Sequence, residues 1–174
     1  YTIMGICSSL IPYAEHNQSP RNGYESAMAK QALGIFSTNF DIRVYSRSHI
    51  LHYPQIPLVK TKPMEIMNFD ERPSGQNCVL AVLSLQGYNM EDSIIINRSS
   101  IELGLERSSF FRIYEADSRQ YLGGLRDKFE IPEAGTRGHR GDRYYRLLEE
   151  DGIISVEAPV SGNMVLIGRV SPPR

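Results

Sequence analysis

Hydrophobic positions along the chain fall into short clusters separated by Gly, Pro and polar residues, so the sequence predicts short elements. The clearest helical pattern follows Ser19 and Pro20 and stops before Gly34. Serine before a helix, proline in its first turn and glycine beyond its end are the usual residues at helix boundaries. We therefore predict a helix over about residues 20–33.

Two continuous apolar runs predict buried strands in the middle of the chain. Residues 78–85 are almost entirely aliphatic or small, and residues 94–96 are three isoleucines. Apolar runs without polar alternation are typical of strands that are covered on both faces. Two buried strands would then flank a polar connection over residues 86–92.

Weaker patterns complete the outline, and the sequence predicts from them a mixed α/β fold that is mostly β. Glycines and arginines alternate between residues 119 and 146, which indicates a loop. A boundary between an α/β part and a β-rich part is expected at about residues 105–110. The other expected elements are extended pieces at 42–45 and 50–53, a short helix capped by Ser99 or Ser100, a strand over 109–114, and a β-hairpin over 153–170 after a turn at Asp151 and Gly152.

Composition and charge exclude several classes of protein. Of 174 residues, 41% are hydrophobic, which is enough for a core, and a net charge of −1 gives no general attraction to polyanions. Cys7 and Cys78 lie far apart, so we expect a reducing cytoplasm and neither a disulfide framework nor a paired-thiol zinc site. No apolar stretch reaches the roughly 20 residues that a membrane helix needs. Since the chain starts at Tyr1, without an initiator Met or a signal peptide, we expect it to be a piece of a longer polypeptide.

Arg21 is the first candidate for chemistry. It would lie in the first helical turn, where the helix dipole disfavours a cation by roughly 0.3–1 kcal/mol. A phosphate facing the free amides of the helix start and the guanidinium would reverse the sign of that effect. The alternative is an ion pair with Glu25, four residues further on. The residues alone leave both interpretations open.

The pair Glu91 and Asp92 is the second candidate. Adjacent residues of a strand point to opposite faces, so both carboxylates can serve one cation only from a turn, which Gly87 and Asn89 predict. Carboxylates beside a phosphate-binding arginine suit Mg²⁺-assisted phosphoryl or nucleotidyl transfer. The alternative is a helix cap or a solvated carboxylate in a loop.

The other polar residues give weaker indications of a metal site or a nucleic-acid-binding site. The histidines show one close pair, His49 and His52, which in extended backbone would point to opposite faces, so we assign all four histidines to packing or to the surface. Acidic residues offset the arginines around 137–146, which favours a solvated charged face over a nucleic-acid grip. The sequence holds no Walker loop, nucleophile elbow or metalloprotease helix motif.

Five stretches read together resemble one known family. They are SLIPYAEHNQSPRN at residues 9–22, MAKQALG at 28–34, HYPQ at 52–55, GQN at 75–77 and GYNMEDS at 87–93. In these stretches the chain resembles the second-largest subunit of multisubunit DNA-directed RNA polymerase, the equivalent of bacterial β, in its archaeal or eukaryote-like form. The resemblance extends over essentially the whole chain.

That resemblance implies a fold and a division into domains. Residues 1–107 would be the first part of the hybrid-binding domain, which contributes strands to a double-psi β-barrel, and residues 108–174 the first part of the wall, or flap. The aspartates that hold the main catalytic Mg²⁺ would lie on the largest subunit, and two lysines near the RNA end would follow downstream of this chain. The chain alone is therefore expected to be an inactive part of a nucleotidyltransferase.

The resemblance also implies roles for matching residues near the nucleotide. Arg21 would be a catalytic residue that reaches the phosphates of the incoming nucleoside triphosphate, with Gln18 and Tyr24 on the nucleotide and RNA-end side. Lys30 and Gln31 would lie near the RNA of the hybrid.

Glu91 and Asp92, the other catalytic residues implied, would act on a second Mg²⁺ carried by the nucleotide, through water or long contacts. The implied partners are the largest and other polymerase subunits, the DNA template, the RNA transcript and the triphosphate, with no membrane. The implied location is the cytoplasm, or the nucleus of a eukaryote. The alternative is a structural segment of the wall and hybrid channel that only steers nucleic acid.

Overall fold

A computed structural model describes residues 3–173 of the chain. The chain divides into two compact units, residues 1–113 and 114–174. The division falls just after β2 (Ser108–Arg112), because this strand pairs with β1 (Arg47–Leu51) inside the first unit. The assignment of residues 1–107 to a hybrid-binding domain and 108–174 to a wall stays a prediction.

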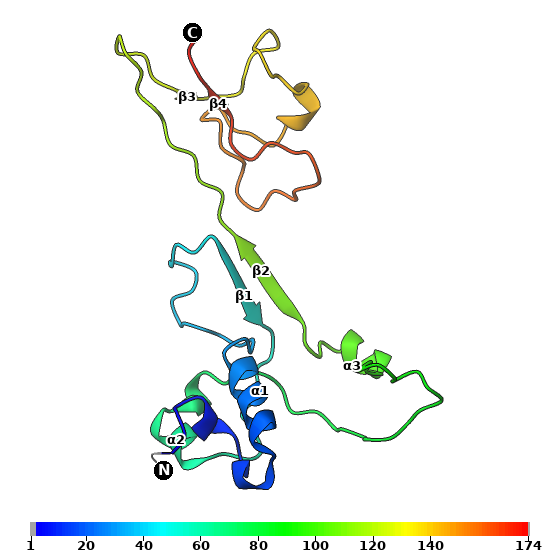
Figure 1. Ribbon diagram of the computed structural model, residues 1–174. Coiled ribbons are helices and arrows are strands. Elements are labelled where there is room, and N and C mark those ends of the chain that lie inside the picture. The colour runs from blue at the N-terminus through cyan, green and yellow to red at the C-terminus, as the bar shows by residue number, and fades with distance from the viewer. Residues whose placement is uncertain (1–2, 174) are drawn as a thin grey trace. The chain divides into compact units, whose positions relative to one another are not determined.

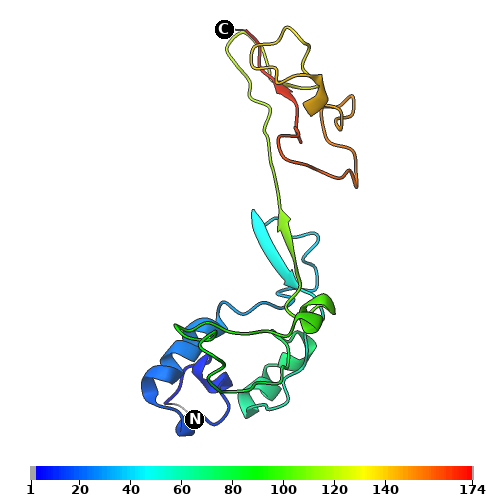
Figure 2. The same cartoon turned by 90° about the vertical axis from the view of Figure 1, so that its right-hand side faces the viewer.

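The first unit is built from short helices and one β-ribbon (Figure 1). The main helix α1 (Ser19–Ala29) and the short α2 (Lys62–Ile66) both pack against η1 (Ser8–Leu10), and the two views show these helices grouped together (Figure 2). Ala14 and Met64 are among the few buried apolar residues. The remaining elements of this unit are η2 (Ala14–His16), η3 (Phe69–Glu71) and α3 (Arg98–Glu102).

Helix α1 differs at both ends from the predicted helix. Gln18 is the N-cap, so Ser19 is the first helical residue and its prediction as the cap was wrong. The helix ends at Ala29 with Lys30 as its C-cap, earlier than residue 33. The chain beyond Ala29 tightens into turns in which amides donate three residues back, from Gln31 to Met28 and from Ala32 to Ala29. Such turns end an α-helix before the glycine is reached.

The β-ribbon places the small core of the first unit. β1 and β2 run antiparallel with Ile50 opposite Ser109, and Ile50 and Leu51 are buried. The predicted strand over 109–114 is confirmed, although β2 starts one residue earlier and ends two residues earlier than predicted, whereas residues 42–45 form no strand. The His49 ring lies 4.7 Å from that of Phe110, which fits the prediction of a packing role.

The two predicted buried strands in the middle of the chain are wrong for this structure. Residues 78–85 and 94–96 form no strand, and apolar side chains in both runs are exposed, Val79 completely. Both views show residues 78–97 as a long irregular trace leading to α3 (Figures 1 and 2). A strand needs a paired neighbour and a covered face, and no segment among residues 3–173 supplies either to these runs.

Asn97, and neither of the two predicted serines, caps α3. Its side-chain oxygen accepts a hydrogen bond from the Ser100 amide at 3.3 Å. The helix ends at Glu102, and Gly104 follows with a φ of 108°, a conformation that glycine adopts without strain. The predicted short helix before Gly104 is therefore confirmed, with a different cap.

The second unit has little regular structure. β3 (Lys128–Phe129) pairs antiparallel with β4 (Arg169–Val170), and η4 (Asp142–Tyr144) lies between them in sequence. The predicted hairpin over 153–170 is confirmed only in part: Ile153 forms an antiparallel bridge with Ile167, whereas β4 at its end pairs with β3. The predicted turn is confirmed, since the Gly152 amide donates to the Glu149 carbonyl at 2.9 Å. Tyr145 and Leu148 are the buried apolar residues.

The fold class is mixed helix and strand with two small antiparallel sheets, and residues 3–173 contain no closed barrel. Cys7 and Cys78 are both free thiols. Within the same residues, every helix is too short or too polar to cross a bilayer.

Candidate functional site

Arg21 lies exposed in the first turn of α1 without the ion pair that was its alternative role. Glu25 instead accepts a hydrogen bond from the Asn17 side chain at 3.3 Å. Across residues 3–173 no carboxylate lies within ion-pair distance of Arg21, whose Cζ atom lies 5.6 Å from the centre of the Tyr24 ring. The fork of guanidinium N–H donors is thus oriented by an aromatic ring and available to a carboxylate or phosphate anion.

The start of α1 offers fewer free amides than the sequence predicts. Pro20 has no N–H group, and the amides of Arg21 and Asn22 both donate to the Gln18 carbonyl, at 2.9 and 3.3 Å. In the described chain Ser19 retains the one unbonded amide of this turn. An anion here would therefore be held mainly by the Arg21 guanidinium.

The other residues predicted on α1 lie at its two ends. Gln18 and Tyr24 are exposed beside Arg21, with Gln18 in extended backbone before the helix. Lys30 and Gln31 are exposed at the opposite end. A cation at Lys30 is favoured there, because the carbonyl end of a helix carries partial negative charge.

Contacts with the segment before the helix hold α1 in place. The Asn22 side chain donates from Nδ2 to the Ala14 carbonyl at 2.9 Å, and the Ser8 and Ser26 hydroxyl oxygens lie 2.7 Å apart. Both contacts leave from the same side of the helix at positions 22 and 26, one turn apart. They fix the rotation of the helix about its axis and therefore the direction in which the Arg21 side chain points.

Glu91 and Asp92 occupy a tight turn, which confirms the predicted backbone. The Ser93 amide donates to the Met90 carbonyl at 3.1 Å, and the two residues between them have φ angles of 53° and 62°. Two successive left-handed residues closed by that hydrogen bond define a type I′ turn. Both carboxylates are exposed and, within residues 3–173, form no hydrogen bond or ion pair.

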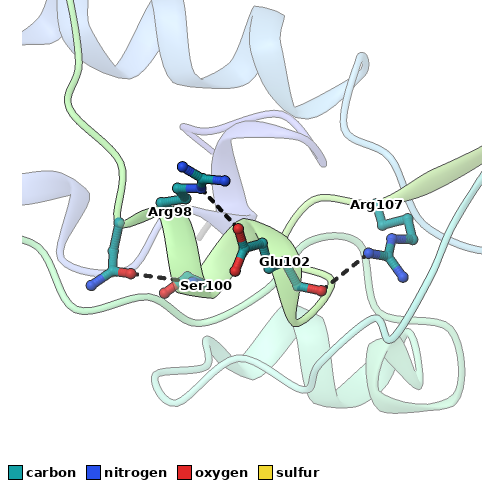
Figure 3. A network of polar contacts seen from close by, with 5 residues as sticks. Arg98, Ser100, Glu102 and Arg107 are labelled. Atoms are coloured by element: carbon teal, nitrogen blue, oxygen red, sulfur yellow. Dashed lines mark hydrogen bonds and ion pairs between the residues drawn. The ribbon is translucent and has the colours of Figure 1, made fainter.

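Helix α3 follows this acidic turn and carries its own polar contacts (Figure 3). Arg98 donates from Nε to Glu102 at 2.8 Å, and Arg107 donates to the Glu102 carbonyl at 3.3 Å. Because these exposed contacts are local, they stabilise the helix and do not fix the turn that precedes it.

Three side-chain amides that the site predictions missed tie distant segments of the first unit together. We define Gln55, Gln76 and Asn77 as the amide clamp. Gln76 donates from Nε2 to the His52 carbonyl at 2.9 Å and to the Tyr53 carbonyl at 3.1 Å, and its Oε1 accepts from the Glu106 amide at 2.8 Å. The signal was present in the sequence, since HYPQ and GQN carry these amides.

The residues present fit a partly hydrated Mg²⁺ ion rather than a complete protein cage. No group of three or more His, Cys, Asp or Glu residues among 3–173 is arranged to hold a metal. Magnesium in nucleotide sites typically keeps several waters and binds one or two carboxylates together with substrate phosphates. Glu91 and Asp92, exposed and unpaired, match that donor set. No hydrogen bond or ion pair in the described chain links them to Arg21.

Comparison with known proteins gives one consistent family. The family model described as RNA polymerase Rpb2, domain 6, matches residues 7–174. The chain is 58% identical over 172 residues to DNA-directed RNA polymerase subunit Rpo2 of Saccharolobus solfataricus, which covers 99% of the chain and 15% of that relative. It is 49% identical over 170 residues to DNA-directed RNA polymerase II subunit RPB2 of Encephalitozoon cuniculi, covering 98% and 15%.

A plant relative, DNA-directed RNA polymerase II subunit 2 of Arabidopsis thaliana, is 44% identical over 171 residues, covering 98% of the chain and 14% of the relative. The chain thus spans about 15% of the length of the curated relatives that it matches. Matches of this identity along almost the entire chain show that it belongs to the Rpb2 domain 6 family, as a fragment of the second-largest subunit of DNA-directed RNA polymerase.

Proposed function

We propose that this chain forms part of the active-centre side of a DNA-directed RNA polymerase and positions the incoming nucleoside triphosphate during nucleotidyl transfer. The observation that carries the proposal is the exposed Arg21 guanidinium, which stands over the Tyr24 ring without a carboxylate partner among residues 3–173. A buried or paired arginine would favour a structural role. An exposed, oriented arginine favours a phosphate ligand.

In the proposed reaction the 3′-hydroxyl of the RNA attacks the α-phosphate of the nucleotide, and pyrophosphate leaves. Arg21 binds the triphosphate through charge-assisted hydrogen bonds and holds it for the attack. Gln18 and Tyr24 flank the nucleotide on the same helix end. Lys30 and Gln31, at the far end of α1, contact the RNA of the hybrid, where the ammonium neutralises a backbone phosphate.

Glu91 and Asp92 would hold a second Mg²⁺ through water or direct oxygen contacts. When bound, the ion supplies neutralisation of triphosphate charge and of the leaving oxygen. The contribution of the chain is the turn, which keeps two adjacent carboxylates exposed and unpaired. The main Mg²⁺ site belongs to the largest subunit, so the chain alone is inactive.

The wider proposal places the chain within the complete subunit. Residues 1–107 belong to the hybrid-binding domain and 108–174 to the wall. In the whole protein the first part would contribute to the double-psi β-barrel, and the rest of the subunit would cover the exposed apolar runs 78–85 and 94–96. The partners are the other polymerase subunits, DNA template and RNA transcript, in the cytoplasm or in a eukaryotic nucleus.

The test is to remove the charge of the acidic turn without changing its backbone. In the assembled polymerase, Glu91→Gln combined with Asp92→Asn keeps side-chain size, and asparagine tolerates the left-handed conformation. We expect the Mg²⁺ concentration for half-maximal nucleotide addition to rise at least about tenfold, because metal affinity falls when its oxygen ligands lose their charge.

The control is another adjacent acidic pair, Asp70→Asn combined with Glu71→Gln, which makes the same charge change in η3, where Asp70 is the ion-pair partner of Lys60. It should leave the Mg²⁺ requirement unchanged. If the turn variant has an unchanged Mg²⁺ requirement as well, the carboxylates do not act on the ion, and a structural segment that only steers nucleic acid becomes the better account.

A further inference from the structure

The segment that carries the acidic turn has few contacts of its own. Between Cys78 and Leu103 nearly every residue is exposed, and the internal bonds are local. Asn89 donates to the Leu83 carbonyl at 2.6 Å and accepts from the Leu85 amide at 3.1 Å, while turns follow at 86–93. Local bonds shape the turn but do not place it relative to the rest of the unit. Its placement must come from the two ends of the segment.

The upstream end is fixed by Asn77. Its Nδ2 donates to the Ile56 carbonyl at 2.8 Å and to Gln55 Oε1 at 3.3 Å, and its Oδ1 accepts from the Leu58 amide at 3.2 Å. The backbone amide of Asn77 also donates to Gln55 Oε1 at 2.9 Å. Every polar atom of this side chain therefore has a partner in the stretch that follows β1.

The downstream end of the segment, residues 104–109, is held by the β-ribbon and by residues 52 and 53, which follow β1. The His52 amide donates to the Arg107 carbonyl at 2.8 Å, and His52 Nε2 lies 2.5 Å from the Ser109 hydroxyl. Gly104 lies close to the Tyr53 ring: a Cβ atom placed on Gly104 would be 3.5 Å from a ring carbon. Residues 52–58 thus form the platform on which both ends rest.

Gln76 is the one side chain of the clamp that bonds both ends. Its two N–H groups hold the platform at His52 and Tyr53, and its carbonyl oxygen receives the Glu106 amide. Gln76 therefore bonds residue 106 directly to this platform, in addition to the His52–Arg107 bond, with all of its polar groups in use. This arrangement holds together residues 76 and 106, the two ends of the segment that carries Glu91 and Asp92. We call this pair of ends the neck of the segment.

We propose that Gln76 is a positioning residue that fixes the acidic turn for the incoming nucleotide and its metal ion. The proposal rests on the proposed function of Glu91 and Asp92. Gln76 touches no substrate and acts through the neck. A carboxylate at this position would face the His52 and Tyr53 carbonyls with oxygen instead of N–H groups, so two attractive contacts become repulsive.

The test uses the assembled polymerase with Gln76→Glu and, as a variant of similar length that adds no charge, Gln76→Met. We expect the Mg²⁺ concentration for half-maximal nucleotide addition to rise about tenfold in both, as for other groups that orient a metal ligand. A rise with the glutamate variant alone would assign the effect to its charge and overturn the proposal. The control Gln120→Glu changes an exposed glutamine of the second unit and should have no effect.

Hydrogen exchange gives a readout independent of activity. The Glu106 amide should exchange faster in Gln76→Met than in the parent enzyme, because it loses its acceptor, whereas Gln76→Glu keeps an oxygen that can accept this hydrogen bond. Unchanged exchange at Glu106 in Gln76→Met would show that the neck is held without Gln76 and would overturn the proposal, even for a variant that assembles poorly.

A combination separates this proposal from the proposed function. Added to the Glu91→Gln and Asp92→Asn variant, Gln76→Met should cause no further change in the Mg²⁺ requirement, because the carboxylates through which it acts are already neutral. A further, additive rise would assign Gln76 to general stability and overturn the inference alone. If the acidic-turn variant itself shows no Mg²⁺ effect, the proposed function of that pair fails first.

Discussion

At Glu91 and Asp92 the backbone adopts left-handed angles that cost roughly 1–2 kcal/mol per residue for most side chains. Glycine would occupy both positions with less strain, but it has no carboxylate. Seven other non-glycine residues of the described chain also have positive φ angles, so the strain alone does not mark the site. The same strain explains why alanine is a poor test of these positions, since it would change turn stability and charge together.

Asp127 is a second residue whose environment has a measurable consequence. Its side chain is fully buried in the second unit, where Oδ2 accepts from the Arg119 amide at 3.1 Å and lies 3.9 Å from Arg169 Nε. A hydrogen bond from Ser171, followed by those from Arg119 and Tyr121 and by the charge of Arg169, lowers the pKa of Asp127 although burial opposes the shift. A lowered pKa means that folding favours the carboxylate.

The stabilisation from Asp127 is therefore present above the ordinary aspartate pKa of 3.8 and is lost as the pH falls through the lower folded value. In the assembled enzyme we expect hydrogen-exchange protection of the Arg119 amide to fall as the pH is lowered from about 6 to 3. Asp127→Asn should show weaker protection that changes little with pH.

The control for that pH series is Glu150→Gln, which neutralises an exposed carboxylate of the same unit and should keep the parent's pH dependence. A parent enzyme whose Arg119 protection is the same at both ends of the series would contradict the role given to Asp127.

Gly34 lies between α1 and β1 in sequence and contacts both the β-ribbon and Ser74, which precedes Gln76 of the amide clamp by two residues. Its carbonyl accepts from the Leu51 amide at 3.1 Å, and it forms a β-bridge with Ser74. A Cβ atom there would lie 2.7 Å from the Pro73 carbonyl oxygen and 2.8 Å from Ser74 Oγ. No real Cβ makes such contacts with backbone, so the neighbouring chain must move.

Gly34→Ala should therefore destabilise the first unit by about 1–3 kcal/mol, the usual cost of overpacking. Thermal inactivation of the assembled enzyme measures this as a shorter half-life. Gly23→Ala is the matched control because space is open around Gly23 in α1, where alanine is favoured by roughly 0.5–1 kcal/mol. Equal half-lives for the two variants would contradict the packing described at Gly34.

Elements set by local residues were predictable from the sequence, and those set by distant partners were not. The proline in the first turn located α1, and Gly87 and Asn89 indicated the turn before Glu91. The end of α1 was missed because amides beyond Ala29 bond three residues back, a choice that glycine spacing does not reveal. Gln76 was missed because its partners lie 24 and 30 residues away in sequence.

The apolar runs failed as strand predictions for a different reason. Hydrophobic patterning reports that side chains such as Val79 and Val82 are buried in some environment, and it does not say which chain segment covers them. Within residues 3–173 nothing covers them. The candidate residues Arg21, Glu91 and Asp92 came from motifs rather than from periodicity, so this failure left them unaffected.

Large apolar side chains are exposed in both units of the molecule, beyond what a small independent domain tolerates. Leu58, Leu80, Val82, Leu103, Leu122 and Val156 are each at least 79% exposed, and no large side chain of the described residues is completely buried. Such surface marks protein contacts or aggregation. The small buried core agrees with a segment that is stabilised within the much longer chains of its relatives.

We expect the isolated 174-residue chain to bind a hydrophobic dye and to self-associate, and to incorporate no nucleotide on a DNA template. The first two follow from the exposed apolar surface, and the last from the proposal that the main Mg²⁺ site lies on the largest subunit. Dye fluorescence, sedimentation and a primer-extension assay measure the three properties. A monomeric chain with no dye binding, or one that extends RNA, would contradict this account.

The decisive measurement is nucleotide addition by the assembled polymerase carrying Arg21→Lys, at limiting triphosphate, with hybrid retention followed in parallel. Lysine keeps the charge and loses the planar fork, so a bidentate phosphate contact worth roughly 1.5–3 kcal/mol should be lost. We predict a fall of about ten- to a hundredfold in the efficiency of addition with unchanged hybrid retention, while Arg98→Lys, at an exposed pair on α3, has no effect. Normal addition by Arg21→Lys, or loss of the hybrid with normal addition, would contradict the proposed role of this chain at the triphosphate.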